Sequence, residues 1–247
     1  GSSWTELADL AIARHSAAAG IGTTTNAIIA GGYDGSGKEN ITEIWAWDSS
    51  LAAGAWASGG NLNTGRAGGV GFGIQTAAIF AGGIAQPPNT NLAVVEQYDG
   101  SSWTEIADIN TARRELGDAG TTAAGLIFNG IGASPINAGS IITEKWNGTS
   151  WTEVGDTNTV GYQNAGTGTS TAALSIGRAA PGLSPTIRGE TEEFDGSSWT
   201  ESGDLNTARS YAGAAGTQTA SILASGDTNN PYPNRVANAE TYDGSSW

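Results

Sequence analysis

The sequence predicts an all-β fold built from repeated, four-stranded antiparallel sheets. A Trp-anchored motif recurs along the whole chain, Asp-Gly and Asn-Gly turns separate short alternating segments, and helical periodicity is absent. Sheets of this kind bury their faces against one another when they are arranged radially. We therefore expect one domain over residues 1–247, a five-bladed β-propeller.

The repeat is defined by six tryptophans at nearly constant spacing. Successive members are 52, 47, 48, 48 and 48 residues apart, and most follow a Gly-Ser-Ser or Gly-Thr-Ser turn. They are Trp4, Trp56, Trp103, Trp151, Trp199 and Trp247. A Trp in every unit could stack on sugars, but we interpret these residues as blade-packing side chains, each of which buries roughly 150–250 Å².

Each unit is expected to form four short strands in a fixed order. An Arg precedes a stretch of small residues, an apolar run ends in Gly, an alternating segment ends in an aromatic residue before Asp-Gly or Asn-Gly, and Trp begins the last strand. The repeated arginines are Arg14, Arg66, Arg113 and Arg209, whereas the fourth unit has Gly161.

This order of Arg, small residues, apolar-Gly-Gly, Glu-x-Tyr-Asp and Trp resembles the kelch repeat. Gly31-Gly32 and Gly82-Gly83 match its double glycine, while Asn129-Gly130, Gly177 and Ser225-Gly226 depart from it. The near-identical Tyr-Asp-Gly-Ser-Ser-Trp-Thr-Glu and Asn-Thr-Ala-Arg runs also resemble repeats in predicted virion or tail-associated proteins of marine bacteriophages.

The kelch resemblance implies that the strand after each Arg is innermost, beside a central channel. Small residues there permit close backbone approach, which suits a narrow five-bladed ring. A fragment of a six- or seven-bladed propeller is the alternative. We expect residues 4–9 to complete the blade of residues 210–244, which would close the ring and leave Trp247 displaced or disordered. Because it has no Met, the chain is expected to be a processed product or an excised piece.

Most acidic residues recur at the same place in each unit and are therefore interpreted as architectural. The fifth residue after Trp is acidic in four units, as Asp9, Asp108, Asp156 and Asp204. We expect these carboxylates to pair with the repeated arginines across blade junctions. Asp156 lacks such an Arg, so the fourth blade should be locally rearranged.

Two acidic residues, Glu115 and Asp118, have no counterpart in the other units. They could form a channel ion site or a general acid/base pair, but a solvated channel mouth is the favoured interpretation. His15 follows Arg14 and is expected to be structural or solvated, because a single His without a positioned Ser is no catalytic triad.

Variable loops between the second and third strands are the most adjustable surface. They span about residues 33–40, 84–93, 131–140, 178–189 and 227–238, contain all seven prolines, and should emerge on the face of the blade-to-blade linkers. Loops on a rigid scaffold commonly bind ligands. The candidate contacts are Tyr33, Asn89, Asn91, Arg188, Asn230, Tyr232 and Arg235.

Charge and composition exclude several classes of function. The formal charge of −14 disfavours nucleic acid, and no apolar run is long enough for a membrane span. Without Cys and with one His, no metal or cofactor is expected. We predict a non-enzymatic binding or display module that meets a glycan or protein, on a virion or outside the cell. A structural spacer and a glycan-active enzyme are the alternatives.

Overall fold

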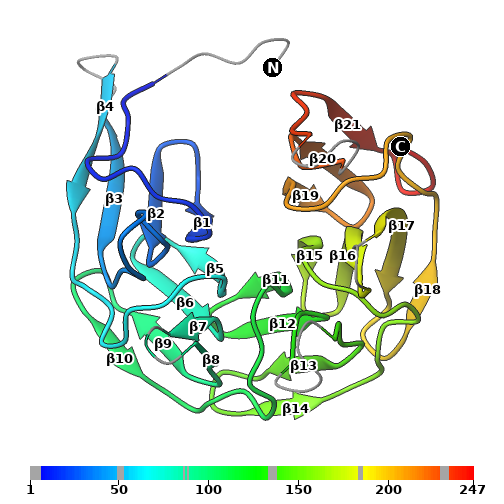
Figure 1. Cartoon of the computed structure of the whole chain (residues 1–247), viewed down its shortest axis with the longest axis horizontal. Coiled ribbons are helices and arrows are strands. Elements are labelled where there is room, and N and C mark those ends of the chain that lie inside the picture. Colours follow the sequence, from blue (N-terminus) through cyan, green and yellow to red (C-terminus); the bar gives the residue numbers. More distant parts are fainter. Residues whose placement is uncertain are drawn as a thin grey trace.

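The protein is an all-β, five-bladed β-propeller, as the sequence predicts (Figure 1). This computed structural model describes residues 7–48, 53–85, 87, 89–132, 138–182, 186–228 and 234–247. Within these ranges no helix is long and apolar enough to cross a membrane. The blades follow one another around a common axis in chain order, and Figure 1 shows the arc open between the first and the last.

Four blades are four-stranded antiparallel sheets that run from the channel to the outer edge. The first comprises β1 (Ala18–Gly22), β2 (Asn26–Ala30), β3 (Thr42–Asp48) and β4 (Ala53–Ser58). The second comprises β5 (Val70–Ile74), β6 (Ala77–Ala81), β9 (Val95–Tyr98) and β10 (Trp103–Glu105). The third comprises β11 (Gly117–Thr121), β12 (Ala124–Phe128), β13 (Thr143–Trp146) and β14 (Trp151–Glu153). The fourth comprises β15 (Ala165–Thr169), β16 (Ala172–Ala180), β17 (Thr186–Phe194) and β18 (Trp199–Glu201).

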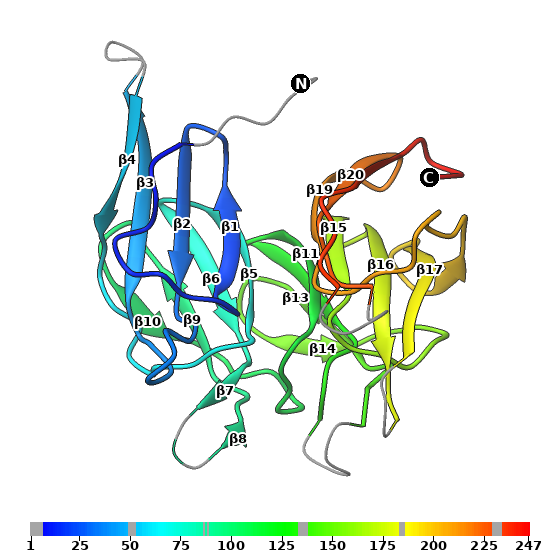
Figure 2. The same ribbon diagram turned by 45° about the horizontal axis from the view of Figure 1, so that its top comes forward.

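The fifth blade has three described strands, β19 (Gly213–Thr217), β20 (Ala220–Ala224) and β21 (Ala239–Tyr242). A small hairpin of β7 (Ile84–Ala85) and β8 (Thr90–Asn91) extends the loop of the second blade. It projects from one face of the propeller in Figure 2. In the fourth blade β16 and β17 run well into the segment that was expected to be a loop, and they leave only residues 181–185 between them.

The repeated tryptophans pack between blades, as expected for architectural residues. Trp103, Trp151 and Trp199 are buried, and each ring lies about 5 Å from the aromatic ring at the end of the preceding strand. The indole N–H of Trp103 donates to Thr42 Oγ1 of the first blade at 3.0 Å. Trp199 makes the same bond to Thr143 of the third blade. Each Trp therefore joins its own blade to the one before.

Trp247 fills the equivalent position of the fifth blade, so its predicted displacement is wrong. Its ring lies 5.1 Å from that of Tyr242, and its indole N–H donates to Thr191 Oγ1 at 3.0 Å. Its carbonyl accepts from Asn206 Nδ2 at 2.9 Å. The closing strand was expected at residues 4–9. Residues 4–6, which include Trp4, lie outside the described residues, and residues 7–9 are not in a strand.

A buried ion pair between Arg and Glu recurs in all five blades. The pairs are Arg14–Glu43, Arg66–Glu96, Arg113–Glu144, Arg178–Glu192 and Arg209–Glu240. Every one of these arginine side chains is fully buried. The expected pairing with the repeated aspartates is therefore wrong. Asp9, Asp108 and Asp204 are exposed, whereas the Glu on the third strand faces the guanidinium inside the blade.

The linker that enters each blade satisfies the remaining oxygen of this Glu. Glu144 Oε2 accepts from the backbone N–H and the side-chain amide of Asn110, both at 2.7 Å. Glu96, Glu192 and Glu240 accept the same pair of bonds from Asn63, Asn158 and Asn206. A buried carboxylate needs such partners because burial without them is costly. The Asn-Thr dipeptide of the repeat is thus a clamp on the ion pair.

The predicted rearrangement of the fourth blade is a transfer of the cation to another strand. Arg178 occupies the second position of the double-glycine motif, and its guanidinium reaches Glu192 at 2.9 Å. Gly161 stands where the other blades have Arg, and a Cβ at this position would lie 2.6 Å from Arg178 Cδ. The loss of one Arg and the gain of the other are therefore a matched exchange.

Glu144→Gln should lower the free energy of unfolding by about 3 kcal/mol, because Arg113 then keeps a buried charge without a counter-ion. The exposed Glu153→Gln should change it by less than about 0.5 kcal/mol. Urea unfolding at pH 7 measures both values. Equal effects of the two substitutions would contradict the role of the pair.

Gly161→Arg alone should destabilise the fourth blade by about 3 kcal/mol, because two guanidinium groups would then compete for the carboxylate of Glu192. The double variant Gly161→Arg/Arg178→Gly restores the arrangement of the other blades and should recover most of this loss. A double-mutant cycle in urea measures the coupling. Additive effects would show that the two sites are independent.

Candidate functional site

The five inner strands line a central channel, with a cavity of about 600 Å³ between them. One mouth of this channel is formed by the second residue after each repeated Arg position, and we call these five residues the mouth ring. They are Ser16, Gly68, Glu115, Gln163 and Tyr211. All five have a φ between +53° and +65°. Only glycine adopts this conformation without cost.

Backbone hydrogen bonds link the mouth ring from blade to blade. Gly68 N donates to Ser16 O at 2.8 Å, and Glu115 N donates to Gly68 O at 2.6 Å. Gln163 N donates to Glu115 O at 2.8 Å, and Tyr211 N donates to Gln163 O at 3.0 Å. The left-handed conformation is what orients each residue for this belt, so the side chains at these positions are held in a fixed array.

Three polar side chains of the mouth ring meet at its third, fourth and fifth positions. Gln163 Nε2 donates to Glu115 Oε2 at 2.6 Å and to the phenol oxygen of Tyr211 at 2.5 Å. Tyr211 is 52% exposed, which leaves most of its ring open to a ligand. Arg114 Nε lies 3.6 Å from Glu115 Oε1 and balances part of its charge. A carboxylate, an amide and an aromatic face therefore point into one opening.

Asp118 lies deeper in the channel, on β11. The equivalent inner-strand residues are Gly20, Gly71, Gly166 and Ala214, so no other blade places a polar side chain at this level. Asp118 lines the cavity, and burial of its carboxyl raises the pKa of this group to about 7, because desolvation disfavours the charged form. A carboxyl with such a pKa in a cleft is a recognised signature of functional sites.

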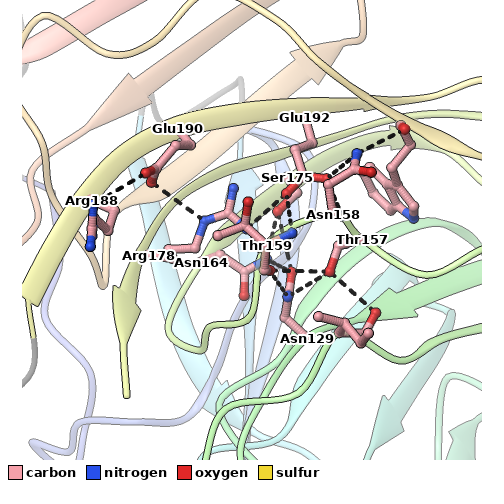
Figure 3. A network of polar contacts seen from close by, with 12 residues as sticks. Asn129, Thr157, Asn158, Thr159, Asn164, Ser175, Arg178, Arg188, Glu190 and Glu192 are labelled. Carbon is pink, nitrogen blue, oxygen red and sulfur yellow. Dashed lines mark hydrogen bonds and ion pairs between the residues drawn. The ribbon is translucent and has the colours of Figure 1, made fainter. Parts of the chain in front are cut away.

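The junction behind this wall, between the third and fourth blades, is polar where other junctions are apolar. Thr157 takes the position of Leu62, Ile109 and Leu205, and Ser175 takes that of Phe80, Ile127 and Leu223. Figure 3 shows both side chains in one network with Asn129 and Asn164. Asn129 Nδ2 donates to Thr157 Oγ1 at 2.9 Å, and Asn164 Nδ2 donates to Ser175 Oγ at 3.1 Å.

This network places a buried acceptor beside the channel. Asn164 lines the cavity and is 6% exposed, and its Oδ1 atom has no hydrogen-bond partner. At the outer end of the network Arg178 Nε lies 3.8 Å from Glu190 (Figure 3). The departures from the repeat thus gather around one side of the channel, from Glu115 and Asp118 to Gln163 and Asn164.

The loop residues proposed as contacts lie on the face of the mouth ring. The bridges Ala67–Ile84 and Arg114–Ile131 join the segment after each Arg to the start of the variable loops. Asn91 lies beside the mouth ring, since its Oδ1 accepts from Arg114 Nη1 at 2.7 Å and Arg114 precedes Glu115. Tyr33 contacts His15, with ring centroids 5.3 Å apart, which gives His15 a structural contact.

The other proposed contacts that the structure describes pair with residues outside the mouth ring. Asn89 accepts from Lys38 at 2.7 Å and joins the loops of the first two blades. Arg188 lies 3.7 Å from Glu190 on β17, and Arg235 is exposed beside Asp227. Asn230 and Tyr232 lie outside the described residues. Where the structure describes the chain, no three His, Asp or Glu side chains gather to hold a metal ion.

Sequence analysis identified Glu115 but missed Gln163 and Tyr211 at the same repeat position. Aligning the five units on Arg or Gly161 would have revealed them, because this position changes from Ser and Gly to Glu, Gln and Tyr. The same alignment would have shown the four polar residues of the third junction.

Asp118→Asn should leave stability unchanged near pH 4 and increase it at pH 8.5. The folded-state pKa of about 7 lies above the unfolded value of 3.8. The free energy of unfolding therefore falls by up to about 4 kcal/mol as the pH rises through this interval, and the Asn substitution removes that loss of stability. Thermal unfolding from pH 4 to 9 measures it. Asp108→Asn, at an exposed site, is the control. Parallel curves for wild type and Asp118→Asn would contradict the prediction.

Comparison with known proteins supports the fold and leaves the chemistry open. No protein-family model and no curated protein matches the chain. Among solved structures, "Structure of YjhT" matches with a TM-score of 0.79 and 12% sequence identity, over 97% of this chain and 84% of that chain. At this identity the match shows the fold alone. The kelch and bacteriophage likenesses remain sequence resemblances.

Proposed function

We propose that the protein is a binding module that holds a neutral, hydroxyl-rich ligand, a saccharide, at the channel mouth. The supporting observation is that Glu115, Gln163 and Tyr211 occupy left-handed positions where glycine fits without strain. Backbone strain of this kind costs about 1–3 kcal/mol and clusters at ligand sites. Retaining three long side chains there has no architectural benefit, since Gly68 makes the same belt.

The chemistry of the three side chains matches a saccharide. The carboxylate of Glu115 accepts from hydroxyl groups, the amide of Gln163 both donates and accepts, and the exposed ring of Tyr211 offers an apolar face. Glu115, Asp118 and the net charge of −14 repel an anionic ligand. Asn91 and Arg114 extend the site toward the variable loops.

The setting we propose is a virion or another extracellular surface, where the module would meet a host glycan or protein. The support is the likeness of the Tyr-Asp-Gly-Ser-Ser-Trp runs to repeats of phage tail-associated proteins. The alternative is a structural spacer that binds no ligand. A spacer would not explain why long side chains are kept at mouth-ring positions whose backbone conformation favours glycine.

One observation favours a glycan-active enzyme as a second candidate. Asp118 has a pKa of about 7 and lines the same cavity as Glu115, three residues earlier in the chain, so it could be a general acid near a second carboxyl. In that case, substitution of Asp118 alone would abolish turnover of a bound glycan while leaving its affinity unchanged. The binding module predicts no turnover by any variant.

A glycan array, with and without calcium, should identify a saccharide that binds with a stoichiometry near one. Tyr211→Gly and Gln163→Gly should each weaken binding at least tenfold. Their stability should change by less than about 1 kcal/mol, because relief of backbone strain offsets the lost contacts. Glu105→Gln, at an exposed repeated position, should bind normally.

Calorimetry on the array hit supplies the stoichiometry. A value near five would place the site on repeated residues instead of the mouth ring. Absence of any glycan binding would favour the spacer.

A further inference from the structure

The first and the fifth blades lie on either side of the open arc in Figure 1, and among the described residues each has a packing face that is more exposed than its equivalents in the other blades. In the first four blades the central residue of the second strand is completely buried by the blade that follows. These residues are Ile28, Ile79, Leu126 and Leu174, each 0% exposed. Their equivalent in the fifth blade, Ile222, is 37% exposed.

The surroundings of Ile222 are uncovered in the same way. Ala215 and Thr241 flank it on the neighbouring strands, and both are exposed. Ala239 is exposed too, whereas Thr42, Val95, Thr143 and Thr191 at this position are 0% exposed. The exposed residues are small or apolar, so this face has the composition of an internal blade interface and not of a solvated surface.

The first blade shows the complementary pattern on its opposite face. Ile29 is half-buried, whereas its equivalents in the other blades are all 0% exposed: Phe80, Ile127, Ser175 and Leu223. Trp56 and Leu10 are half-buried as well, although their equivalents in the second and third blades are buried. In those blades each of these positions packs against the preceding blade.

We propose that the open arc is a docking site for one further unit of this same repeat, folded as a sixth blade. Only a blade of this type has the two faces required, one to cover Ile222 and one to receive Trp56 and Ile29. The chain has six Trp motifs, and the five described sheets already hold Trp56, Trp103, Trp151, Trp199 and Trp247. The repeat is thus represented once more than these sheets can accommodate.

A second copy of the protein fits this site less well than a single further unit. If its first blade entered the arc, its second blade would have to occupy the place of the resident first blade.

The test adds a sixth unit to the full chain by appending a copy of residues 104–153 after Trp247. The control extension has the same length, with the copied Arg113, Glu144 and Trp151 replaced by Ala. The native unit should raise the melting temperature by at least 5 °C. It should slow amide hydrogen exchange in β19–β21 at least tenfold and abolish binding of an apolar dye. The control should do none of these. Identical exchange in both extended chains would overturn the proposal.

A point substitution separates docking from a general effect of the extension. Ile222→Glu should be tolerated in the 247-residue chain, because the side chain is already exposed, and should abolish the gain in the extended chain. Leu174→Glu at the equivalent buried position should unfold both. Sedimentation of the unextended chain over a hundredfold range of concentration tests the other occupant. A dimer that protects β19–β21 would overturn the proposal in favour of a second copy.

Discussion

The buried pair of Arg and Glu is the interaction on which each blade depends. It joins the end of the inter-blade linker to the third strand, and both side chains are fully buried in the blade. Small inner strands rich in Gly and Ala bury little apolar surface, so each blade needs a second means of fixing its strands. Because Asn63 and its equivalents saturate the Glu, the carboxylate cannot be removed without leaving several donors unpaired. Arg178 shows that the charge is what matters: the cation has moved to another strand, and the pair has survived.

A scaffold fixed in this repetitive way makes departures from the repeat informative. Positions that keep the fold are the same in every blade, whereas Glu115, Asp118, Gln163, Tyr211 and the network around Asn129 occur once. They lie on one arc of the channel, and the polar junction extends behind them (Figure 3). A buried polar network needs all of its members satisfied, so it is difficult to acquire by drift alone. The asymmetry therefore points to a function of that arc, separate from the stability of the blade.

The fold was predictable because the repeat states the order of the strands and the turns between them. The blade count follows from the Trp motifs, and the role of Trp follows from its recurrence. The prediction of which acidic side chain contacts each repeated Arg was wrong. Asp108 and Glu144 are both repeated acids, and their spacing in the sequence does not reveal that Glu144 is the one that lies 2.8 Å from Arg113. The prediction for Trp247 was wrong for a similar reason, since Trp4 and Trp247 were both assigned to one position in the last blade. Within the site, Glu115 and Asp118 were recognised because they are charged where other blades have uncharged residues. Gln163 and Tyr211 were missed because they are uncharged and residues of these types also occur elsewhere in the chain.

The channel mouth and the open arc are physically connected. The belt of backbone hydrogen bonds runs from Ser16 through Gly68, Glu115 and Gln163 to Tyr211. Its two end residues precede β1 and β19, the inner strands of the first and fifth blades, and these two blades flank the arc. A blade docked there would bring a sixth residue between Tyr211 and Ser16, and it would narrow the cavity on the side away from Asp118. Tyr211 accepts a hydrogen bond from Gln163 of the fourth blade, and its side chain is 52% exposed at the edge of the arc. A ligand that has to order an exposed aromatic side chain loses affinity to that ordering. Completion of the ring would thus act on the site through preorganisation, without contributing a contact to the ligand.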